Sequence, residues 1–327
     1  MRETTFSEAI REVMCEEMRR NPSVFLMGED VGVFEGVWGV SHGMLAEFGP
    51  ERVIDTAISE AAIIGNGLGA ALVGMRPIVE MMFGDFMMCA GDQIVNQVAK
   101  ARYMSGGVAN VPLVIRVATG SPGSAGAQHS QSPESWFLNV PGLKIVVPAT
   151  PADAKGLLRT AVRGEDPVLF FEHKMLYAVK GPVPEDPEFA IPFGKANIVR
   201  PGKDVTVIAI SMMLQKALAA AETLAAEGID IEIIDPRTLV PLDKQTIIQS
   251  VAKTSRAVIV HEAHVRGGPG AELAAMLAEE AIEYLDAPVV RVGAKNVPLP
   301  YSPDLENFVL PSEEDVVEGV RSLFGKA

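Results

Sequence analysis

The stretch KIVVPATPADAKGLLRTAVRGEDPVLFF, residues 144–171, contains a complete strand, helix and strand pattern. Lys144–Val147 and Pro167–Phe171 are short apolar runs rich in β-branched or aromatic residues, as is typical of buried strands. Between them, Asp153–Arg163 has the pattern of a helix. Apolar strands joined through a helix are typical of a parallel sheet that helices cover on both faces. The stretch therefore predicts an α/β fold.

The same alternation continues along the chain in both directions. Before this stretch it predicts a helix from Phe6, a helix at 92–103, and strands at 23–27, 77–81 and 112–117. After a proline-rich segment at 181–204, it predicts strands at 205–210, 231–234, 256–261 and 288–293 and helices at 213–226, 271–284 and 313–324. We therefore expect two domains, 1–187 and 188–327, each with a mostly parallel sheet flanked by helices.

Composition excludes several classes of protein. The formal net charge of -14 would repel a phosphate backbone, so nucleic acid is not an expected partner. The most apolar segment, 61–75, is too short to span a bilayer, and residues 1–5 lack the zones of a secretory signal. The two cysteines, Cys15 and Cys89, predict neither a disulfide framework nor a zinc site. These features favour a cytoplasmic protein without a membrane association.

One acidic residue stands out in the segment DTAISEAAIIG, residues 55–65. Glu60 is the only carboxylate between Asp55 and Glu80, and its neighbours are mainly apolar. A charge costs free energy if it is buried without a partner. On this segment alone, however, the simpler interpretation is that Ser59 caps a helix and Glu60 lies in its first turn.

Two further segments could carry chemistry. His129 lies in AQHSQ, a polar loop reached through the Gly- and Ser-rich run 120–126, and histidine titrates near neutrality. Phe86 lies in the aromatic and Met cluster 83–88, directly after a predicted strand. Taken alone, the loop histidine is more often incidental, and the cluster is more often core packing.

Two glycine-rich runs could be mistaken for phosphate sites. Gly65–Ala70 matches G-x-G-x-x-A, but no strand directly precedes it, and Gly65 and Gly69 are one helical turn apart. Small residues at that spacing predict close helix packing instead. Gly267–Gly270 lies between a predicted strand and a helix, where either an anion site or a tight crossover turn would explain it.

Several motifs, taken in order, carry a resemblance to a known family. They are GEDV (28–31), DTAISE (55–60), RPIVEMMFGDF (76–86), DQIVNQVAK (92–100), RYMSGG (102–107), AQHSQ (127–131), PGLKIVVP (141–148), DAKGLL (153–158), DPVLFFEHKMLY (166–177), IPFGKA (191–196) and VPLPYSPDLE (297–306). Together they cover nearly the whole chain. The chain resembles the beta subunits of the thiamine-diphosphate-dependent decarboxylase component of 2-oxo acid dehydrogenase complexes.

The resemblance implies a pyrimidine-binding transketolase-like domain followed by a transketolase C-terminal-like domain. It also implies roles for four residues. Glu60 would bond a ring nitrogen of the cofactor's aminopyrimidine and favour its imino tautomer, and Phe86 would stack on that ring. His129 would stand near the reacting thiazolium carbon while the acyl group passes to lipoamide. Glu29 resembles the family's second carboxylate, on a proton path between paired active sites.

The resemblance further implies metals and partners. A structural potassium would be held by backbone oxygens at Leu113, Ala161, Val162, Gly164 and Asp166. The family's G-D-G motif with a following pair of Asn is absent from the sequence, so the Mg²⁺ and diphosphate ligands are expected from an alpha subunit. The implied assembly is an alpha-2 beta-2 heterotetramer that faces a lipoyl-bearing dihydrolipoamide acyltransferase core.

The function that the resemblance implies is oxidative decarboxylation of a 2-oxo acid such as pyruvate, with reductive acylation of lipoyl groups. FGDF, EHKMLY and IPFGKAN are somewhat closer to acetoin dehydrogenase beta subunits, so acetoin is the alternative substrate. A non-catalytic scaffold subunit is a more distant alternative, which retention of Glu60, Phe86 and His129 disfavours. A nicotinamide-dependent oxidoreductase would depend on the Gly65–Ala70 run.

Overall fold

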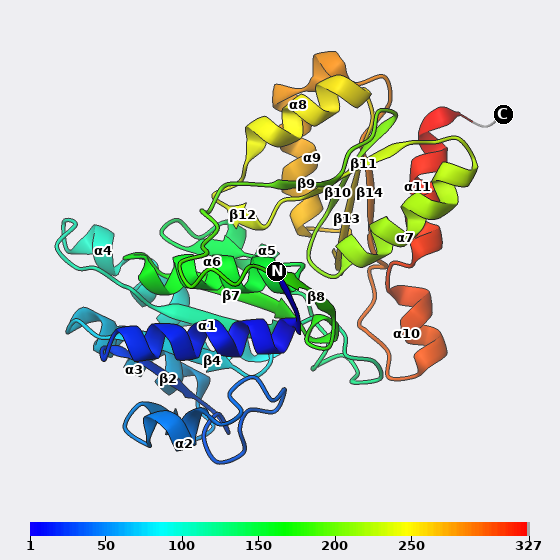
Figure 1. Ribbon diagram of the computed structural model, residues 1–327. Helices are drawn as coiled ribbons and strands as arrows, with labels where there is room; N and C mark the ends of the chain where they lie inside the picture. The colour runs from blue at the N-terminus through cyan, green and yellow to red at the C-terminus, as the bar shows by residue number, and fades with distance from the viewer. Residues whose placement is uncertain (326–327) are drawn as a thin grey trace. The chain divides into compact units, whose positions relative to one another are not determined.

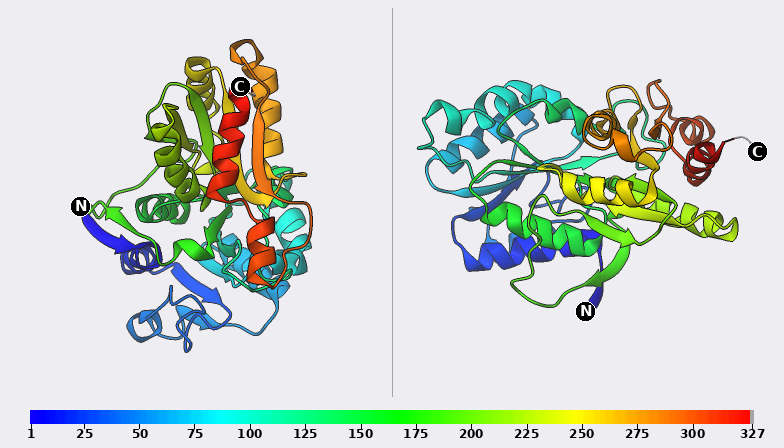
Figure 2. Two further views of the ribbon diagram at one scale, coloured as in Figure 1. Left: turned by 90° about the vertical axis from the view of Figure 1, so that its right-hand side faces the viewer. Right: turned by 90° about the horizontal axis from the view of Figure 1, so that it is seen from above.

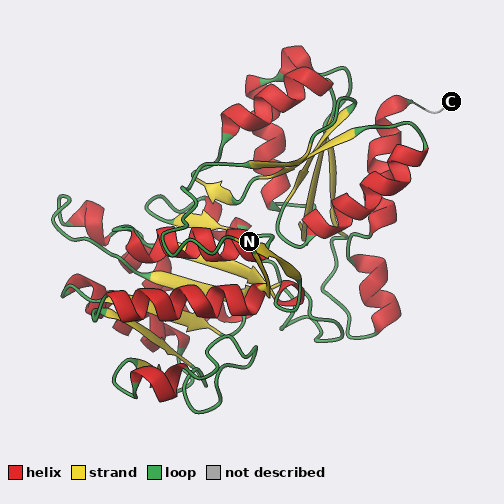
Figure 3. Cartoon of the chain, viewed as in Figure 1, coloured by secondary structure: helices red, strands yellow, loops and turns green. Residues whose placement is uncertain are grey.

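The computed structural model describes residues 1–325, and its helices and strands form two compact units. The first unit comprises residues 1–119 and 136–193, and the second comprises 120–135 and the chain from Gly194 onward. In each unit a sheet is flanked by helices (Figure 3). The predicted α/β class with two mostly parallel sheets is confirmed.

The sheet of the first unit runs β6-β7-β5-β4-β2-β3, with every neighbouring pair parallel. Its strands are β2 (Val24–Gly28), β3 (Val53–Asp55), β4 (Arg76–Met81), β5 (Val114–Thr119), β6 (Lys144–Val146) and β7 (Val168–His173). A separate antiparallel pair joins β1 (Arg2–Thr5) to β8 (Lys180–Val183). Because the sheet is parallel, the carboxyl ends of its strands share one edge.

Helices cover both faces of this sheet. Figures 1 and 2 show α1 (Phe6–Arg20) and α6 (Pro151–Arg163) side by side on one face, and α3 (Glu60–Leu72) with η1 (Gly84–Ala90) and η2 (Gln93–Val98) on the other. The short helices are α2 (Met44–Phe48), α4 (Ala101–Met104), α5 (Ser135–Leu138) and η3 (Lys174–Leu176). The prediction of a single helix at 92–103 was wrong. A π-helix spans 93–98, and Ala99 N donates to Ile94 O at 3.0 Å at its end. Helix α4 follows as a separate element.

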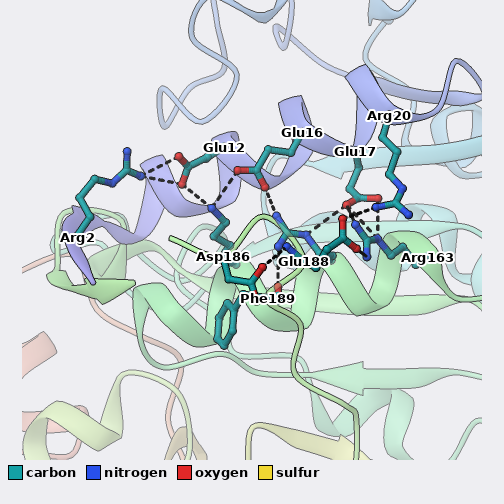
Figure 4. Close-up of polar contacts among 11 residues, drawn as sticks. Arg2, Glu12, Glu16, Glu17, Arg20, Arg163, Asp186, Glu188 and Phe189 are labelled. Atoms are coloured by element: carbon teal, nitrogen blue, oxygen red, sulfur yellow. Dashed lines mark hydrogen bonds and ion pairs between the residues drawn. The ribbon is translucent and has the colours of Figure 1, made fainter. Parts of the chain in front are cut away.

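Ion pairs hold α1 against α6, and Figure 4 shows this row of charges between the two helices. Arg159 is fully buried and donates to Glu16 and to the backbone oxygen of Phe189. Arg163 donates to both carboxylate oxygens of buried Glu17 at 2.7–3.1 Å. A buried charge requires such partners, because losing one leaves the other unpaired in a medium of low dielectric.

The glycine run at 65–70 lies inside α3, so it does not form the strand-to-helix turn of a dinucleotide site. A Cβ added at Gly67 would lie 2.9 Å from Val79 and 3.1 Å from Leu113. A Cβ added at Gly69 would have no atom of a neighbouring element within 4 Å. The expected packing of two helices is therefore found at Gly65, where an added Cβ would lie 3.5 Å from Gln93 of η2, but not at Gly69. Gly67 instead allows α3 to approach the sheet.

The second unit has its own sheet, in the order β14-β13-β10-β11-β9. All neighbouring pairs are parallel except that β9 is antiparallel to β11. The strands are β9 (Asn197–Arg200), β10 (Val205–Ala209), β11 (Ile231–Asp235), β13 (Ala257–His264) and β14 (Val290–Ala294), and a short β12 (Thr238–Val240) follows β11. The helices are α7 (Met213–Ala226), α8 (Lys244–Thr254), α9 (Pro269–Glu280), η4 (Ile282–Tyr284), α10 (Pro303–Val309), α11 (Glu313–Arg321) and η5 (Ser322–Phe324).

The division into units differs from the expected boundary in two respects. The first unit continues to Phe193, past the predicted boundary at 187, because Ile191 N donates to Gly156 O (3.0 Å) and keeps the segment on α6. Residues 120–135 belong to the second unit although they follow β5, which the sequence pattern did not indicate. Across residues 1–325, no helix combines the length and apolar character needed to cross a membrane.

The glycines of the 267–270 run surround a buried histidine. A Cβ at Gly268 or at Gly270 would lie 2.6 Å from a ring atom of His261. Burial lowers the pKa of His261 to about 4, so its ring is neutral near pH 7 and its Nδ1 donates to Ala263 O (2.9 Å). Close packing against this ring explains why glycines occupy these positions, and it agrees with the interpretation of the run as a tight crossover turn.

Candidate active site

Three of the predicted site residues gather at one edge of the first unit's sheet. Glu29 directly follows β2, Glu60 begins the helix after β3, and Phe86 lies in η1, just after β4. In the strand order β4-β2-β3 these strands are neighbours, and all three are parallel. Ligands of open parallel sheets bind outside the carboxyl ends of the strands. The sheet order therefore brings these side chains to the place where this architecture forms its sites.

Glu60 lies at the first position of α3. Ser59 is the N-cap, and its hydroxyl accepts from Ala62 N at 3.4 Å. The predicted capping is therefore confirmed. The Glu60 side chain is half-buried, and the positive end of the helix dipole favours its charge. A carboxylate in this position can accept or donate a proton while it stays attached to a rigid element.

Glu29 is close enough to Glu60 for their charges to interact. Partial burial, and then the negative charges of Glu60 and Asp30, raise the pKa of Glu29 above its ordinary value. Asp55, at the end of β3, fixes the loop after β2 by accepting from Gly32 N (2.6 Å) and Val33 N (2.9 Å). The two carboxylates thus form a pair in which Glu29 holds a proton more readily than an isolated glutamate does.

Phe86 belongs to a chain of aromatic contacts. Its ring meets Phe83 edge to face, with centroids 5.8 Å apart, and Phe83 meets Trp38 in the same way at 5.9 Å. Trp38 stacks on Tyr177 at 5.8 Å. Within the 83–88 cluster Met87 is buried, as core packing predicts, but Phe86 is only half-buried. Phe83 thus packs against this ring, and part of the Phe86 surface stays accessible to a ligand.

Behind these rings lies a buried charge network that the sequence analysis missed. Arg116 is almost fully buried and donates to Glu172 in a bidentate pair (2.8 and 2.7 Å) and to Glu80 at 2.6 Å. Tyr177 donates its hydroxyl to Glu172 at 2.9 Å. Burial raises the pKa of Glu172, although Arg116 opposes the shift. The available signal was a charged residue among the apolar residues of each of three strands: Glu80 in β4, Arg116 in β5 and Glu172 in β7.

His129 lies in the 120–135 loop of the second unit and is half-buried. The loop is closed at its base, where Gly120 N donates to Gln131 O at 2.9 Å. Beside His129, Ala127 and Gln131 line a cavity of about 260 Å³ together with His264 and residues 296–299. His129 is thus presented by a structured loop that belongs to the second unit.

The five residues predicted for potassium lie near the end of α6, where cationic side chains are already present. Arg76 donates through Nε to Val162 O (3.0 Å) and through Nη2 to Gly164 O. The remaining predicted positions make contacts of their own: Leu113 O accepts from Val168 N, Ala161 O accepts from Gly164 N, and the Asp166 carboxylate pairs with Lys144 and Arg102. Each carbonyl oxygen retains a second lone pair, so the donor set is compatible with an ion.

Comparison with known proteins identifies the family to which this arrangement belongs. Residues 2–180 match the pyrimidine-binding domain of transketolase, and residues 194–316 match the transketolase C-terminal domain. The pyruvate dehydrogenase E1 component subunit beta of Rickettsia felis is 48% identical over 319 residues, which cover 98% of each chain. The chain belongs to the E1 beta subunits of the transketolase family. The same subunit of Rhizobium meliloti is 46% identical over 98% of this chain and 69% of that protein.

Two other proteins are similar to this chain over nearly their whole length. The beta subunit of the acetoin:2,6-dichlorophenolindophenol oxidoreductase of Cupriavidus necator is 46% identical, covering 98% of this chain and 97% of that protein. A solved structure described as a split-gene transketolase, an inactive beta4 tetramer, superposes with a TM-score of 0.81 at 26% identity over 97% of both chains. The E1 beta fold expected from the sequence is confirmed.

Proposed function

We propose that this chain is the beta subunit of a pyruvate-type 2-oxo acid dehydrogenase E1 component, which uses thiamine diphosphate and acts only with an alpha subunit. The observation that carries the proposal is the meeting of Glu60, Glu29 and Phe86 at the carboxyl ends of β3, β2 and β4. A half-exposed ring beside a carboxylate on a helix N-terminus fits the pyrimidine end of this cofactor.

The chain's own residues would then have separate roles in the reaction. Glu60 would hold a proton at the pyrimidine ring nitrogen, and Phe86 would orient the ring by stacking. Glu29, with its raised pKa, would share a proton with Glu60. His129 would donate a hydrogen bond or a proton where charge develops during transfer to the lipoyl group. When bound, the cofactor supplies the nucleophilic carbon and the electron sink.

Partners complete the proposal. Among residues 1–325 there is no cluster of three or more His, Cys, Asp or Glu side chains that could hold a metal. We propose, as the family resemblance implies, that an alpha subunit supplies the Mg²⁺ and diphosphate ligands in an alpha-2 beta-2 heterotetramer. A lipoyl-bearing acyltransferase core would receive the acyl group. The description of the split-gene transketolase tetramer of beta chains as inactive supports a requirement for a second kind of chain.

The test is calorimetric titration of thiamine diphosphate and Mg²⁺ into this chain alone, and into its mixture with a candidate alpha chain from a neighbouring gene. We expect saturable binding and pyruvate-dependent lipoamide acylation only in the mixture. Tight binding by this chain alone would contradict the shared site. A mixture of correct mass that binds the cofactor but turns over neither substrate would contradict the catalytic assignment.

Acetoin is the second candidate substrate, because the beta subunit of an acetoin oxidoreductase is as similar to this chain as several pyruvate dehydrogenase subunits are. The same mixture distinguishes the two candidates when kcat/KM is measured for pyruvate and for acetoin with 2,6-dichlorophenolindophenol as acceptor. We expect the larger value for pyruvate, and a larger value for acetoin would replace the first assignment.

We also propose that the protein works in the cytoplasm, which agrees with its two free cysteines, buried Cys15 and exposed Cys89. Disulfides are rare in that reducing compartment. Fractionation of cells that express the tagged chain checks this directly, and recovery in an exported fraction would contradict it.

Potassium at the end of α6 remains a prediction. If an ion joins Arg76 at the carbonyls of Val162 and Gly164, replacing choline chloride by potassium chloride at equal ionic strength should raise the melting temperature of the assembled enzyme. The rise should amount to a few degrees, about 1 kcal/mol or less in the free energy of unfolding. Equal melting temperatures in the two salts would contradict the potassium site, and Arg76 would then be the cation that these two carbonyls bind.

A further inference from the structure

The loop that carries His129 contains a run of left-handed backbone conformations, one of them at a serine. Four of its residues have left-handed backbone angles: Gly120 (φ +74°), Gly123 (φ +93°), Ser124 (φ +53°) and Gly126 (φ +74°). Glycine adopts this region freely, but serine does so only with strain. A hydrogen bond to Ser124 therefore offsets the strain at the one non-glycine position.

Two carboxylates contact the loop, both from later parts of the second unit. Glu262, in β13, accepts from Ser121 N at 2.8 Å. Glu306, in α10, accepts from the Ser121 hydroxyl with one oxygen and from Ser124 N (2.8 Å) with the other. The hydroxyl of Ser121 also accepts from Gly123 N at 3.2 Å. One carboxylate thus bridges the strained Ser124 and the start of the loop, through hydrogen bonds that its charge strengthens.

Glu306 is itself firmly placed. It is 5% exposed, whereas Leu305 and Phe308 on the same helix are 56% and 64% exposed. The helix is anchored by Val309, which packs in a buried cluster with Ala294 and Leu299. Leu299 also belongs to the segment 296–299 that lines the cavity beside the His129 loop. The buried cluster of Val309, Ala294 and Leu299 therefore fixes both the helix that carries Glu306 and the segment 296–299 beside the loop.

We propose that Glu306 is a positioning residue that sets the place of His129 by bridging Ser121 and Ser124. This proposal rests on the proposed function, in which His129 assists acyl transfer to the lipoyl group. No contact of Glu306 with the substrate is required, because its two hydrogen bonds fix the backbone from which the AQHSQ segment projects. A shift of about 1 Å in a catalytic group can lower a rate by about 100-fold.

The test uses the reconstituted alpha and beta enzyme with Glu306→Gln, in which the amide nitrogen replaces one accepting oxygen at nearly the same volume. We expect kcat for acylation of free lipoamide to fall by about 10- to 100-fold. The assay with 2,6-dichlorophenolindophenol, which bypasses the lipoyl acceptor, and the Kd for thiamine diphosphate should change less than about threefold, because the pyrimidine end of the site is untouched. Asp304→Asn, an exposed residue of the same helix, is the matched control and should leave all three values unchanged.

A double-mutant cycle with His129→Ala separates positioning from a purely structural effect. If Glu306 acts through His129, Glu306→Gln should add less than about twofold to the loss already caused by His129→Ala. Additive losses, or equal losses in both assays, would overturn the inference. If Glu306→Gln does not fold, Ser121→Ala removes the hydroxyl donated to Glu306 and is put through the same cycle.

The cycle also keeps this inference distinct from the proposed function. Full lipoamide acylation by His129→Ala would refute the proposed role of His129 and the positioning inference with it. A loss in His129→Ala together with an unaffected Glu306→Gln would refute the positioning inference alone.

Discussion

Glu60→Gln should reduce turnover of the reconstituted enzyme by at least about 100-fold in both the lipoamide and the artificial-acceptor assays. Glutamine keeps the size and hydrogen-bonding shape of the side chain at the start of α3, but it cannot hold and release a proton. The loss should therefore fall on kcat, whereas the Kd for thiamine diphosphate should rise by much less, because Phe86 and the alpha subunit still bind the cofactor.

The control for this substitution is Glu51→Gln, a carboxylate that is exposed in the turn before β3. It should leave turnover within twofold of the unchanged enzyme. If Glu60→Gln were as active as Glu51→Gln, the catalytic assignment would fail, and the alternative of a non-catalytic scaffold subunit would become the better one.

Phe86→Ala should show the complementary pattern, with a larger effect on cofactor binding than on kcat.

Arg116→Met should lower the free energy of unfolding by about 3–5 kcal/mol. The substitution removes the cation that pairs with Glu172 and Glu80, and leaves two buried carboxylates facing each other across β5. Methionine fills much of the volume of the arginine side chain, so the loss of unfolding free energy comes mainly from the unpaired charges of Glu172 and Glu80. Urea denaturation at pH 7, monitored by circular dichroism, measures the effect.

The matched control is Arg102→Met, because Arg102 also pairs with a carboxylate, Asp166, at 2.6 Å, but at the surface. Exposed ion pairs contribute roughly 0–1 kcal/mol, so this variant should unfold almost as the unchanged chain does. Equal losses for the two variants would contradict the view that burial gives the Arg116 network its importance. Adding Glu172→Gln and Glu80→Gln to Arg116→Met should restore part of the stability, because the carboxylate charges are then absent.

Most secondary structure could be predicted because it depends on local sequence. Helix α7 at 213–226 has the predicted bounds, and the β-branched run at 205–210 forms β10 to within a residue. The capping of α3 by Ser59 also follows from neighbouring residues alone. Local patterns failed at 92–103, where a π-helix at 93–98 and a separate short helix at 101–104 replace the single predicted helix.

The site was predicted less completely. Family resemblance singled out Glu60, Glu29, Phe86 and His129, but the residues alone favoured a capped helix, a packed aromatic cluster and an incidental loop histidine. Arg116 went unnoticed, because an arginine inside a strand shows neither its burial nor its partners until the neighbouring strands are placed. Glu306 went unnoticed for the same reason, since its partners Ser121 and Ser124 are 185 and 182 residues away in the sequence.

By itself, the sequence determined the α/β class, two sheets built from alternating apolar strands and helices, and the helix start at Ser59. These features arise from hydrogen bonds and apolar contacts within about a dozen residues. Only the tertiary structure decided that β3, β2 and β4 are neighbours, so that Glu60, Glu29 and Phe86 meet at one edge. It also assigned the His129 loop to the second unit, where Glu262 and Glu306 hold it. Strand order and long-range hydrogen bonds depend on how distant segments pack, and no local pattern encodes that packing.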